Sequence, residues 1–243
     1  MIAGLPMYDR PELRGALDRF WIFIRDSLSE RGIDAPGVLS HDMPLWDLWT
    51  SPDLVLAQTC GFPFREKLHD QVTLVGTPDY DLPDCPPGYY NSVIVAHIND
   101  DRTFAEFDDA CLAVNDPMSQ SGWAAPQQLA QSTGFAFDHT FDTGSHRASI
   151  TAIIEGDADL ASIDAQTWRM MTRWDDVSAL QEITRTPPTP GLPLITAKES
   201  YADQIADAVR SAISALSPED RALLSIRDLV DIPKSEYLLV NTP

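Results

Sequence analysis

Two serines, a glutamine and a glycine begin a segment with helical character, three residues after an apolar strand-like segment, CLAVN at 111–115. The free amides at a helix N-terminus, with the positive end of the helix dipole, bind phosphate, phosphonate, sulfate and carboxylate groups. Serine hydroxyls add donors, and glycine allows close approach of the backbone. The candidate residues are Ser119, Gln120, Ser121 and Gly122. They predict an anion site, and the alternative is that one of the serines only caps the helix.

Two further strand-to-helix connections carry polar side chains in the same position. Ser145 and His146 lie at the start of the next expected helix, and Asp164 directly follows the strand LASI at 160–163. Ligands of open α/β sheets bind at the carboxyl ends of the strands, beside helix N-termini. Each residue alone has an ordinary explanation, such as a surface histidine or an aspartate cap. Three such connections together favour a binding site at one sheet edge.

Segments of strand and helix character alternate along the chain, which predicts an α/β architecture with mostly parallel sheets. The expected strands lie at 2–7, 53–59, 72–77, 89–98, 111–115, 160–163, 179–184 and 236–240. The expected helices lie at 13–28, 121–132 and 201–216, and a further helix ends at Gly156.

Proline and glycine are concentrated at 78–88 and 184–193, on either side of a middle segment. Such breaks are typical of connections between domains. The pattern predicts a discontinuous first lobe, residues 1–88 plus 190–243, and an inserted second lobe, residues 89–189. The two connections would form a hinge beside a cleft that holds the ligand.

The chain is strongly acidic, with 37 Asp and Glu against 17 Lys and Arg among 243 residues, a net charge of −20. Phosphate backbones and anionic membranes require clustered basic residues, and the sequence has no such cluster. Nucleic acid and membrane insertion are therefore not expected. A small anion remains compatible, because backbone amides act at short range while the outer field is screened by salt.

The cysteines and the N-terminus indicate an ordinary intracellular chain. Cys60, Cys85 and Cys111 are far apart and form no CxxC pair, so we expect free thiols and no structural metal site. The N-terminus lacks the basic start and apolar core of a signal peptide. As written, the sequence predicts a soluble cytoplasmic protein without a cofactor.

The segment 115–129 and the later TGSHRAS, EGDADLASID and TPGLP segments resemble the phosphate, phosphite and phosphonate-binding proteins of ABC transporters. These are type 2 periplasmic binding proteins, with two α/β lobes around a hinged cleft. The resemblance covers about 90–168 well and the flanking regions loosely. The family's Ser-Thr-Ser-Gly loop, Ser-His pair and acidic or amide residue fall on residues 119–122, Ser145-His146 and Asp164, with Gln120 in place of threonine.

The resemblance implies a solute-binding protein for a small phosphorus oxyanion, a monomer, located in the periplasm, with an ABC transporter permease as its partner. It also implies contacts from the first lobe, for which Tyr8, Gln58 and Thr59 are the best matches. Asp164 would repel an oxyanion unless a proton or an ammonium lies between them. It therefore predicts a protonated ligand oxygen or the amine of an aminoalkyl phosphonate.

Two other functional classes remain open from the sequence. The missing signal peptide favours a cytosolic enzyme or ligand sensor on the same scaffold, acting on another small anion. Against an enzyme, the chain has no GxSxG, GxGxxG, P-loop or HExxH motif. His139, Asp142 and His146 do not have a standard metal-ligand spacing. We expect a binding protein with no catalytic residues and no metal.

Overall fold

The computed structural model describes residues 1–243, and the chain forms two compact units. Unit 1 comprises Met1–Pro83 and Pro190–Leu238, and unit 2 comprises Asp84–Thr189 and Leu239–Pro243. The last five residues pack with unit 2, whereas the sequence assigned them to the first lobe. A hydrogen bond from Gln128 Nε2 to the carbonyl oxygen of Asn241 holds this tail.

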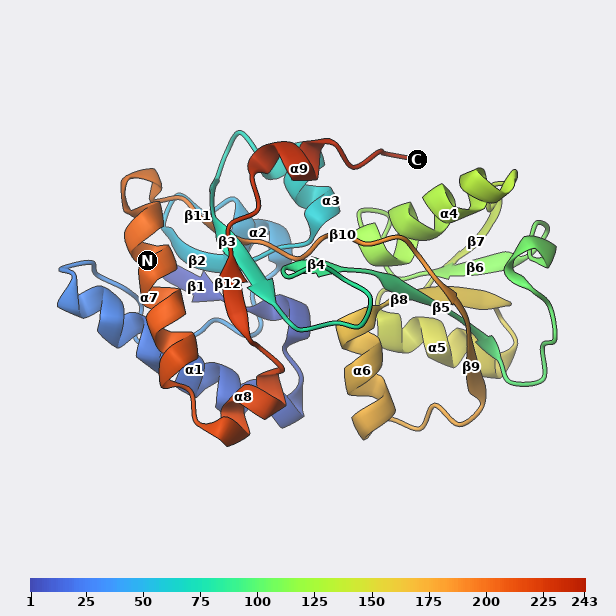
Figure 1. The fold of residues 1–243 in the computed structure, drawn as a ribbon, viewed down its shortest axis with the longest axis horizontal. Coiled ribbons are helices and arrows are strands. Elements are labelled where there is room, and N and C mark those ends of the chain that lie inside the picture. Colours follow the sequence, from blue (N-terminus) through green and yellow to red (C-terminus); the bar gives the residue numbers. More distant parts are fainter. The chain divides into compact units, whose positions relative to one another are not determined.

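Unit 1 is a five-stranded sheet covered by helices (Figure 1). Its strands are β1 (Ile2–Gly4), β2 (Leu54–Gln58), β3 (Thr73–Asp79), β11 (Leu194–Thr196) and β12 (Asp228–Val230). Its helices are α1 (Pro11–Glu30), α2 (Leu45–Trp49), α3 (Gly61–Pro63), α7 (Ala202–Ala215), α8 (Pro218–Leu224) and α9 (Lys234–Leu238). Short 3-10 turns lie at Pro6–Tyr8 and Glu199–Tyr201, and a π-helical turn lies at Phe64–Leu68.

Helix α1 confirms the expected apolar spacing, because its inner face buries Leu13, Leu17, Phe20, Ile24 and Leu28. Proline at its first position and Gly32 just beyond its end fit the usual preferences at helix termini. This face packs against α7, and α7 in turn covers β3.

Unit 2 is a second five-stranded sheet with helices (Figure 1). Its strands are β5 (Ser92–His97), β6 (Cys111–Val114), β7 (His139–Asp142), β8 (Leu160–Asp164) and β9 (Leu180–Arg185). Its helices are α4 (Ala125–Thr133), α5 (His146–Glu155) and α6 (Ala165–Trp174). A 3-10 turn lies at Phe104–Glu106 and a π-helical turn at Gln120–Ala124. The short strands β4 (Tyr89–Tyr90) and β10 (Thr189–Pro190) pair where the chain passes between the units.

Both sheets are mixed, so the expectation of mostly parallel sheets is wrong. The strand order is β1-β2-β11-β3-β12 in unit 1 and β7-β6-β8-β5-β9 in unit 2. In unit 1, β11 runs antiparallel between β2 and β3, and in unit 2, β5 runs antiparallel between β8 and β9. A reversed strand in the middle of a sheet makes both of its pairings antiparallel.

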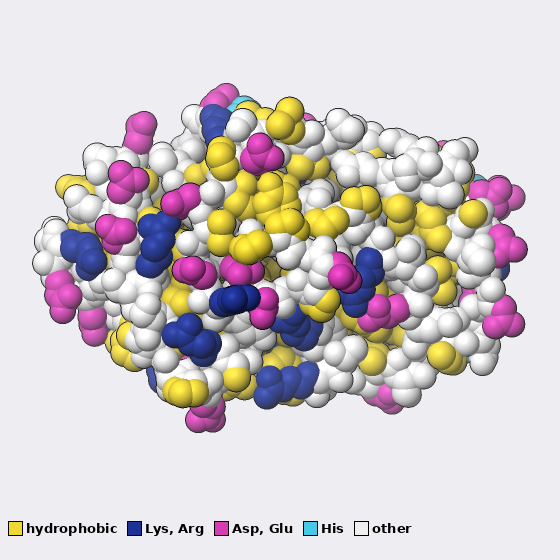
Figure 2. Space-filling view, in the orientation of Figure 1, with side chains coloured by type: hydrophobic (Ala, Val, Ile, Leu, Met, Phe, Trp, Pro, Cys, Tyr) yellow, Lys and Arg dark blue, Asp and Glu magenta, His cyan; other side chains and the backbone are white.

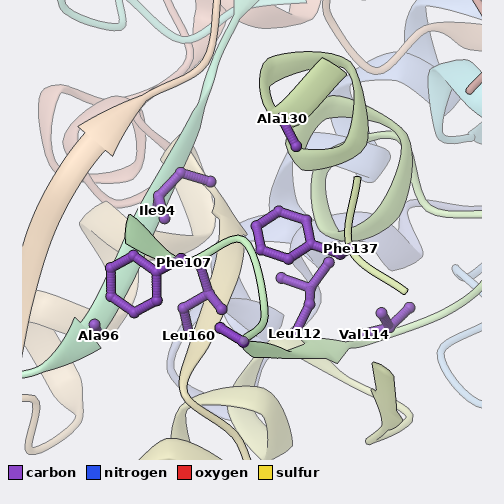
Figure 3. Close-up of a cluster of buried hydrophobic side chains, with 9 residues drawn as sticks. Ile94, Ala96, Phe107, Leu112, Val114, Ala130, Phe137 and Leu160 are labelled. Atoms are coloured by element: carbon purple, nitrogen blue, oxygen red, sulfur yellow. The ribbon is translucent and has the colours of Figure 1, made fainter. Parts of the chain in front are cut away.

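The core of unit 2 lies between its sheet and α4 (Figure 3). Its buried members are Ile94, Ala96, Phe107, Ala110, Leu112, Val114, Ala130, Phe137 and Leu160, and Trp123 packs against them. Burial of one such side chain stabilises a fold by roughly 1.5–3 kcal/mol. The core therefore fixes the strand β6 and the start of α4, and with them the polar run between these elements.

At the C-terminal end of unit 1, one expected element is wrong and one strand was not predicted. Residues 236–240 were expected as a strand, but Lys234–Leu238 forms the helix α9. The buried Tyr237 explains this, because its hydroxyl group bonds Thr77 Oγ1 at 2.6 Å and donates to the Gly191 carbonyl at 3.0 Å. The helical turn after Pro233 places the Tyr237 ring beside Thr77 and Gly191. The strand β12 was not expected.

Charged side chains are distributed over the visible face, and acidic groups are interleaved with Lys and Arg (Figure 2). Many acidic groups are paired, for example Asp220 with Arg19 and Asp100 with Arg102. Exposed ion pairs contribute little stability each, roughly 0–1 kcal/mol. The acidic excess is therefore a property of the surface as a whole.

Candidate functional site

The carboxyl ends of three parallel strands meet at one edge of the unit 2 sheet. β6 lies between β7 and β8 and runs parallel to both. The connections after these strands are tied together, since Thr143 donates from its backbone nitrogen to the Val114 carbonyl at 2.8 Å. Ser162 Oγ donates to the carbonyl oxygen of Ser121 at 2.6 Å. The expected convergence of three polar connections is present in the structure.

The two serines of the polar run have different roles. Ser119 caps the helix, because its Oγ accepts from the Gly122 backbone nitrogen at 3.0 Å. Ser121 does not cap, and its Oγ lies 2.9 Å from His146 Nε2 and 3.4 Å from Ser119 Oγ. Both serines are buried. The cap and the polar cluster are therefore both present, in neighbouring residues.

The helix begins with a π-helical turn, Gln120–Ala124, before α4 continues it. The backbone nitrogens of Trp123 and Ala124 both donate to the Ser119 carbonyl, at 3.2 and 3.0 Å. The Ser121 amide donates to no group in the protein. Such a wide turn, often found at functional sites, leaves amide donors at the helix mouth.

Gly122 is required by the packing of side chains around it. A Cβ atom at this position would lie 1.8 Å from Asn115 Oδ1 and 3.3 Å from His146 Cε1. The sequence attributed this glycine to the close approach of a ligand. The structure shows instead that the side chains of Asn115 and His146 approach the backbone here.

His146 is the first residue of α5, and Ser145 caps this helix by accepting from the Ala148 amide at 3.1 Å. The residue is half-buried, and its Nδ1 is buried and has no hydrogen-bond partner. Burial lowers the pKa of His146 to about 4. The imidazole is therefore neutral at neutral pH, with one nitrogen a donor and the other an acceptor.

Asp164 and Gln120 are also buried beside this edge. Asp164 Oδ1 accepts from the Thr167 backbone nitrogen at 2.8 Å, so this residue caps α6. This is the ordinary explanation that the sequence offered for an aspartate at this position. β8 carries it opposite Ser92 of β5. The structure thus places one buried carboxylate at the same end of the sheet as the serines.

Several buried polar atoms at this end of unit 2 have no hydrogen-bond partner. They are Asn91 Oδ1, Asn115 Oδ1, His146 Nδ1, and both Oε1 and Nε2 of Gln166. Asn91 and Gln166 flank Asp164, since the Ala165 amide donates to the Asn91 carbonyl at 3.1 Å. Buried polar groups are nearly always satisfied in native proteins, so a group of exceptions indicates a place for a ligand or water.

Sequence reasoning missed Asn91, Asn115 and Gln166. Asn115 is the last residue of CLAVN, so the rule that found Asp164 after its strand applies to it as well. Asn91 precedes β5, and its position depends on the reversed direction of that strand. No local signal in the sequence predicts that reversal.

The remaining sequence candidates lie together in unit 1, at the ends of β1 and β2. The Tyr8 ring packs edge-on against Tyr80, with centroids 5.0 Å apart. Gln58 Nε2 donates to the Tyr80 hydroxyl at 3.0 Å and to the Leu192 carbonyl at 3.3 Å. Thr59 is fully buried, and its Oγ1 has no partner. Tyr80 was not expected in this cluster, because residues 78–88 read as a surface connection.

No helix of the chain is long and apolar enough to cross a membrane. No group of three or more His, Cys, Asp and Glu side chains is arranged to hold a metal ion. All three cysteines are free thiols.

Comparison with protein families gives one match that covers most of the chain. The model described as ABC transporter, phosphonate, periplasmic substrate-binding protein matches residues 54–233. None of the curated proteins matches the chain in sequence.

Solved structures similar to this chain share its fold at low identity. PhnD1 from Prochlorococcus marinus, in complex with methylphosphonate, has a TM-score of 0.71 at 15% identity, covering 98% of this chain and 94% of that chain. XAC2383 from Xanthomonas citri, bound to a chloride ion, has 0.73 at 10%, covering 97% and 92%. A binding protein of an ABC phosphonate transporter from Pseudomonas aeruginosa, PA3383, has 0.68 at 16%, covering 98% and 83%.

Proposed function

This chain belongs to the family of periplasmic phosphonate substrate-binding proteins of ABC transporters, and from this premise we propose that unit 2 binds the phosphoryl oxygens of a small phosphonate at Ser119–Gly122 and His146. The family consists of transport components rather than enzymes, in agreement with the expectation from the sequence. The fold is that of the periplasmic binding proteins. The family is periplasmic, and the partner we propose is the membrane component of such a transporter.

One observation carries this proposal: the Ser121–His146 pair lies among buried polar atoms without partners, where three parallel strands end. An unsatisfied buried polar group costs roughly 1–3 kcal/mol. A bound oxyanion would satisfy the donors at this place, which are the Ser121 hydroxyl and amide and Gln166 Nε2. The partnerless side-chain oxygens of Asn91, Asn115 and Gln166 are acceptors and need a donor, such as a protonated oxygen or an amine of the ligand. PhnD1, which has the same fold, was solved with methylphosphonate.

Donors rather than positive charge would hold the anion. His146 is neutral, since burial lowers its pKa to about 4, and none of the proposed contacts is Lys or Arg. An anion favours the tautomer in which Nε2–H donates to Ser121 Oγ, because the hydroxyl hydrogen of Ser121 can then point to the ligand. The Ser121 amide supplies a second donor.

Asp164 would select phosphonates by the protonated oxygen or the amine that they carry. A buried carboxylate beside an oxyanion is unfavourable unless a proton or an ammonium lies between them. Asn91 Oδ1 and Gln166 Oε1 are further buried acceptors without a partner, on residues next to Asp164 in the fold or in the chain. These groups support a ligand with a protonated oxygen or an amine, such as 2-aminoethylphosphonate.

Calorimetric titration with phosphate, phosphite, methylphosphonate and 2-aminoethylphosphonate tests the proposal. We expect at least one to bind, and Ser121→Ala to weaken binding about 10- to 100-fold, the effect of losing a hydrogen bond to a charged group. His146→Ala should also weaken binding, because the Ser121 hydroxyl hydrogen is then no longer directed to the ligand. Ser132→Ala in the last turn of α4 and His139→Ala on the exposed strand β7 are the matched controls. Equal losses in the controls, or no binding across the panel, would exclude this site.

The variant Asp164→Asn distinguishes recognition of the ligand's substituent from recognition of its phosphonate group. Asparagine also caps helices well, so this variant keeps the first turn of α6, which alanine would weaken. We expect the affinity for 2-aminoethylphosphonate to fall about tenfold or more while that for methylphosphonate is retained. If both affinities stay unchanged, Asp164 is only a cap.

A further inference from the structure

The strand β3 of unit 1 has one open edge that the rest of the sheet does not cover. On one side β11 pairs with β3 from Thr73 to Gly76. On the other side β12 pairs only with Thr77, Pro78 and Asp79. The chain leaves the sheet at Asp231 and continues into Pro233, which has no amide hydrogen. Residues 73–76 therefore have no strand beside them on the β12 side.

A cavity of about 680 Å³ lies along this open edge. Its lining comes from unit 1: Phe64, residues 69–76, the end of β11 with the turn before α7 and the start of that helix, and residues 231–234. Figure 1 shows β3 beside β12, with α7 and α9 as the neighbouring helices of the same unit. Thr73 and Leu74 are half-buried and Val75 and Gly76 are buried, but all four line the cavity, so the edge can be reached from it. An exposed strand edge is a template for a further strand.

The rim of this cavity is negatively charged. Asp70, Glu199, Asp203 and Asp231 line it, and Lys234 is its only lysine or arginine. Lys234 Nζ is held by the Asp70 carboxylate and the His69 carbonyl oxygen, at 2.8 and 2.7 Å. Asp231 pairs with Arg210 at 2.5 Å. Glu199 and Asp203 are exposed and have no cationic partner.

We propose that this groove binds an extended segment of a partner protein that carries Lys or Arg, as an added strand on β3. Backbone groups of the segment would pair with the open edge at 73–76, and its cationic side chains would meet Glu199 and Asp203. Strand addition of this kind takes its affinity from main-chain hydrogen bonds and its specificity from alternate side chains. The free carboxylates supply the charge complementarity. This surface belongs to unit 1 alone and is independent of the phosphonate site.

A short peptide with alternating lysine and valine is the probe for this groove. Because the protein carries a net charge of −20, any cationic peptide is attracted to it weakly. The matched probe has the same sequence with N-methylated valines, which keeps the charge and removes alternate backbone donors. We expect the first peptide to bind at least about tenfold more tightly, and to protect amides at 73–76 from hydrogen exchange. Equal binding of the two peptides, or no protection, would overturn the proposal.

Charge variants give a second, independent readout. Asp203→Asn removes an unpaired carboxylate from the rim, and Asp207→Asn removes a carboxylate of the same helix that lies outside the cavity and pairs with Arg210 at 3.5 Å. Both positions are exposed, so neither change threatens the fold. We expect Asp203→Asn to weaken peptide binding about fivefold, and Asp207→Asn to have a much smaller effect. Equal effects would mean that only the overall charge matters, and the groove would be excluded as the docking site.

Discussion

The two units present contrasting clusters at comparable strand ends. In unit 2, Ser121 and His146 bond each other while several neighbouring polar atoms have no partner. In unit 1, Tyr8 and Gln58 both contact Tyr80, and the Gln58 amide nitrogen donates hydrogen bonds to Tyr80 and to Leu192 of the same unit. The unit 2 cluster is polar and incomplete, whereas that of unit 1 is aromatic and nearly complete.

The difference indicates that the polar cluster of unit 2 recognises the ligand, whereas the aromatic cluster of unit 1 has a fixed shape. An incomplete polar cluster gains hydrogen bonds when a ligand arrives, so it contributes affinity and discriminates between ligands. A completed aromatic cluster gains little and acts as a fixed wall. Its one exception is Thr59 Oγ1, which is buried without a partner.

Gly122→Ala should have the largest effect. The new Cβ would lie 1.8 Å from Asn115 Oδ1, a distance that forces the side chain or the helix start to move. Overpacking of this kind costs about 1–3 kcal/mol, so we expect the unfolding free energy to fall by that amount and phosphonate binding to be lost. Denaturant unfolding and calorimetry measure the two effects.

Gly15→Ala in α1 is the control for that change. Gly15 is exposed within the helix, and its added Cβ would meet only the flexible end of Arg19 at 3.4 Å. Alanine should raise stability by about 0.5–1 kcal/mol here and leave binding unchanged. A loss of stability in both variants would show that the environment of Gly122 is not special.

Two histidines should give stability profiles of opposite slope with pH. Burial lowers the pKa of His146 to about 4, so its contribution is present above about pH 6.5 and is lost as pH falls toward 4. Burial alone would also lower the pKa of His41, but the hydrogen bonds that its ring donates to Asp9 and Asp18 outweigh burial and raise that pKa. The contribution of His41 is therefore present below about pH 6.5 and lost as pH rises through the raised value.

Replacing each histidine with glutamine measures these contributions. His146→Gln should remove a fall in unfolding free energy of up to about 3 kcal/mol between pH 6.5 and 4. His41→Gln should cost most at low pH and progressively less above neutrality. Identical profiles for the two variants would contradict the contrast between an uncharged pocket and a pair of carboxylates.

Thr59→Val should have the smallest effect and the opposite sign. Valine has nearly the shape of threonine and removes a buried hydroxyl that has no partner. We expect the unliganded protein to gain about 1 kcal/mol of stability. If the affinity for the phosphonate falls in the same variant, Thr59 contacts the ligand and unit 1 takes part in recognition.

Local signals in the sequence predicted much of unit 2. Helix-capping residues, apolar spacing and polar residues after strands were sufficient to place Ser119, Ser121, His146 and Asp164 at one edge of the sheet. These features depend on contacts between neighbouring residues and on the general rule for parallel strands.

Other features depended on contacts between distant parts of the chain. The reversed direction of β5, which brings Asn91 beside α6, follows from its pairing with β8 and β9. The helix α9 follows from the contacts of Tyr237 with Thr77 and Gly191. Local propensity favoured a strand for EYLLV, and tertiary packing overrode it.

The contact between Asn115 and Gly122 makes the order of mutations matter. While Asn115 is present, every side chain at position 122 meets its oxygen. If position 115 first changes to a smaller residue, alanine at 122 becomes tolerable, and the reverse order passes through a damaged protein. Position 122 should therefore lose its glycine only in sequences in which position 115 has already changed, because non-additivity is expected for residues in contact.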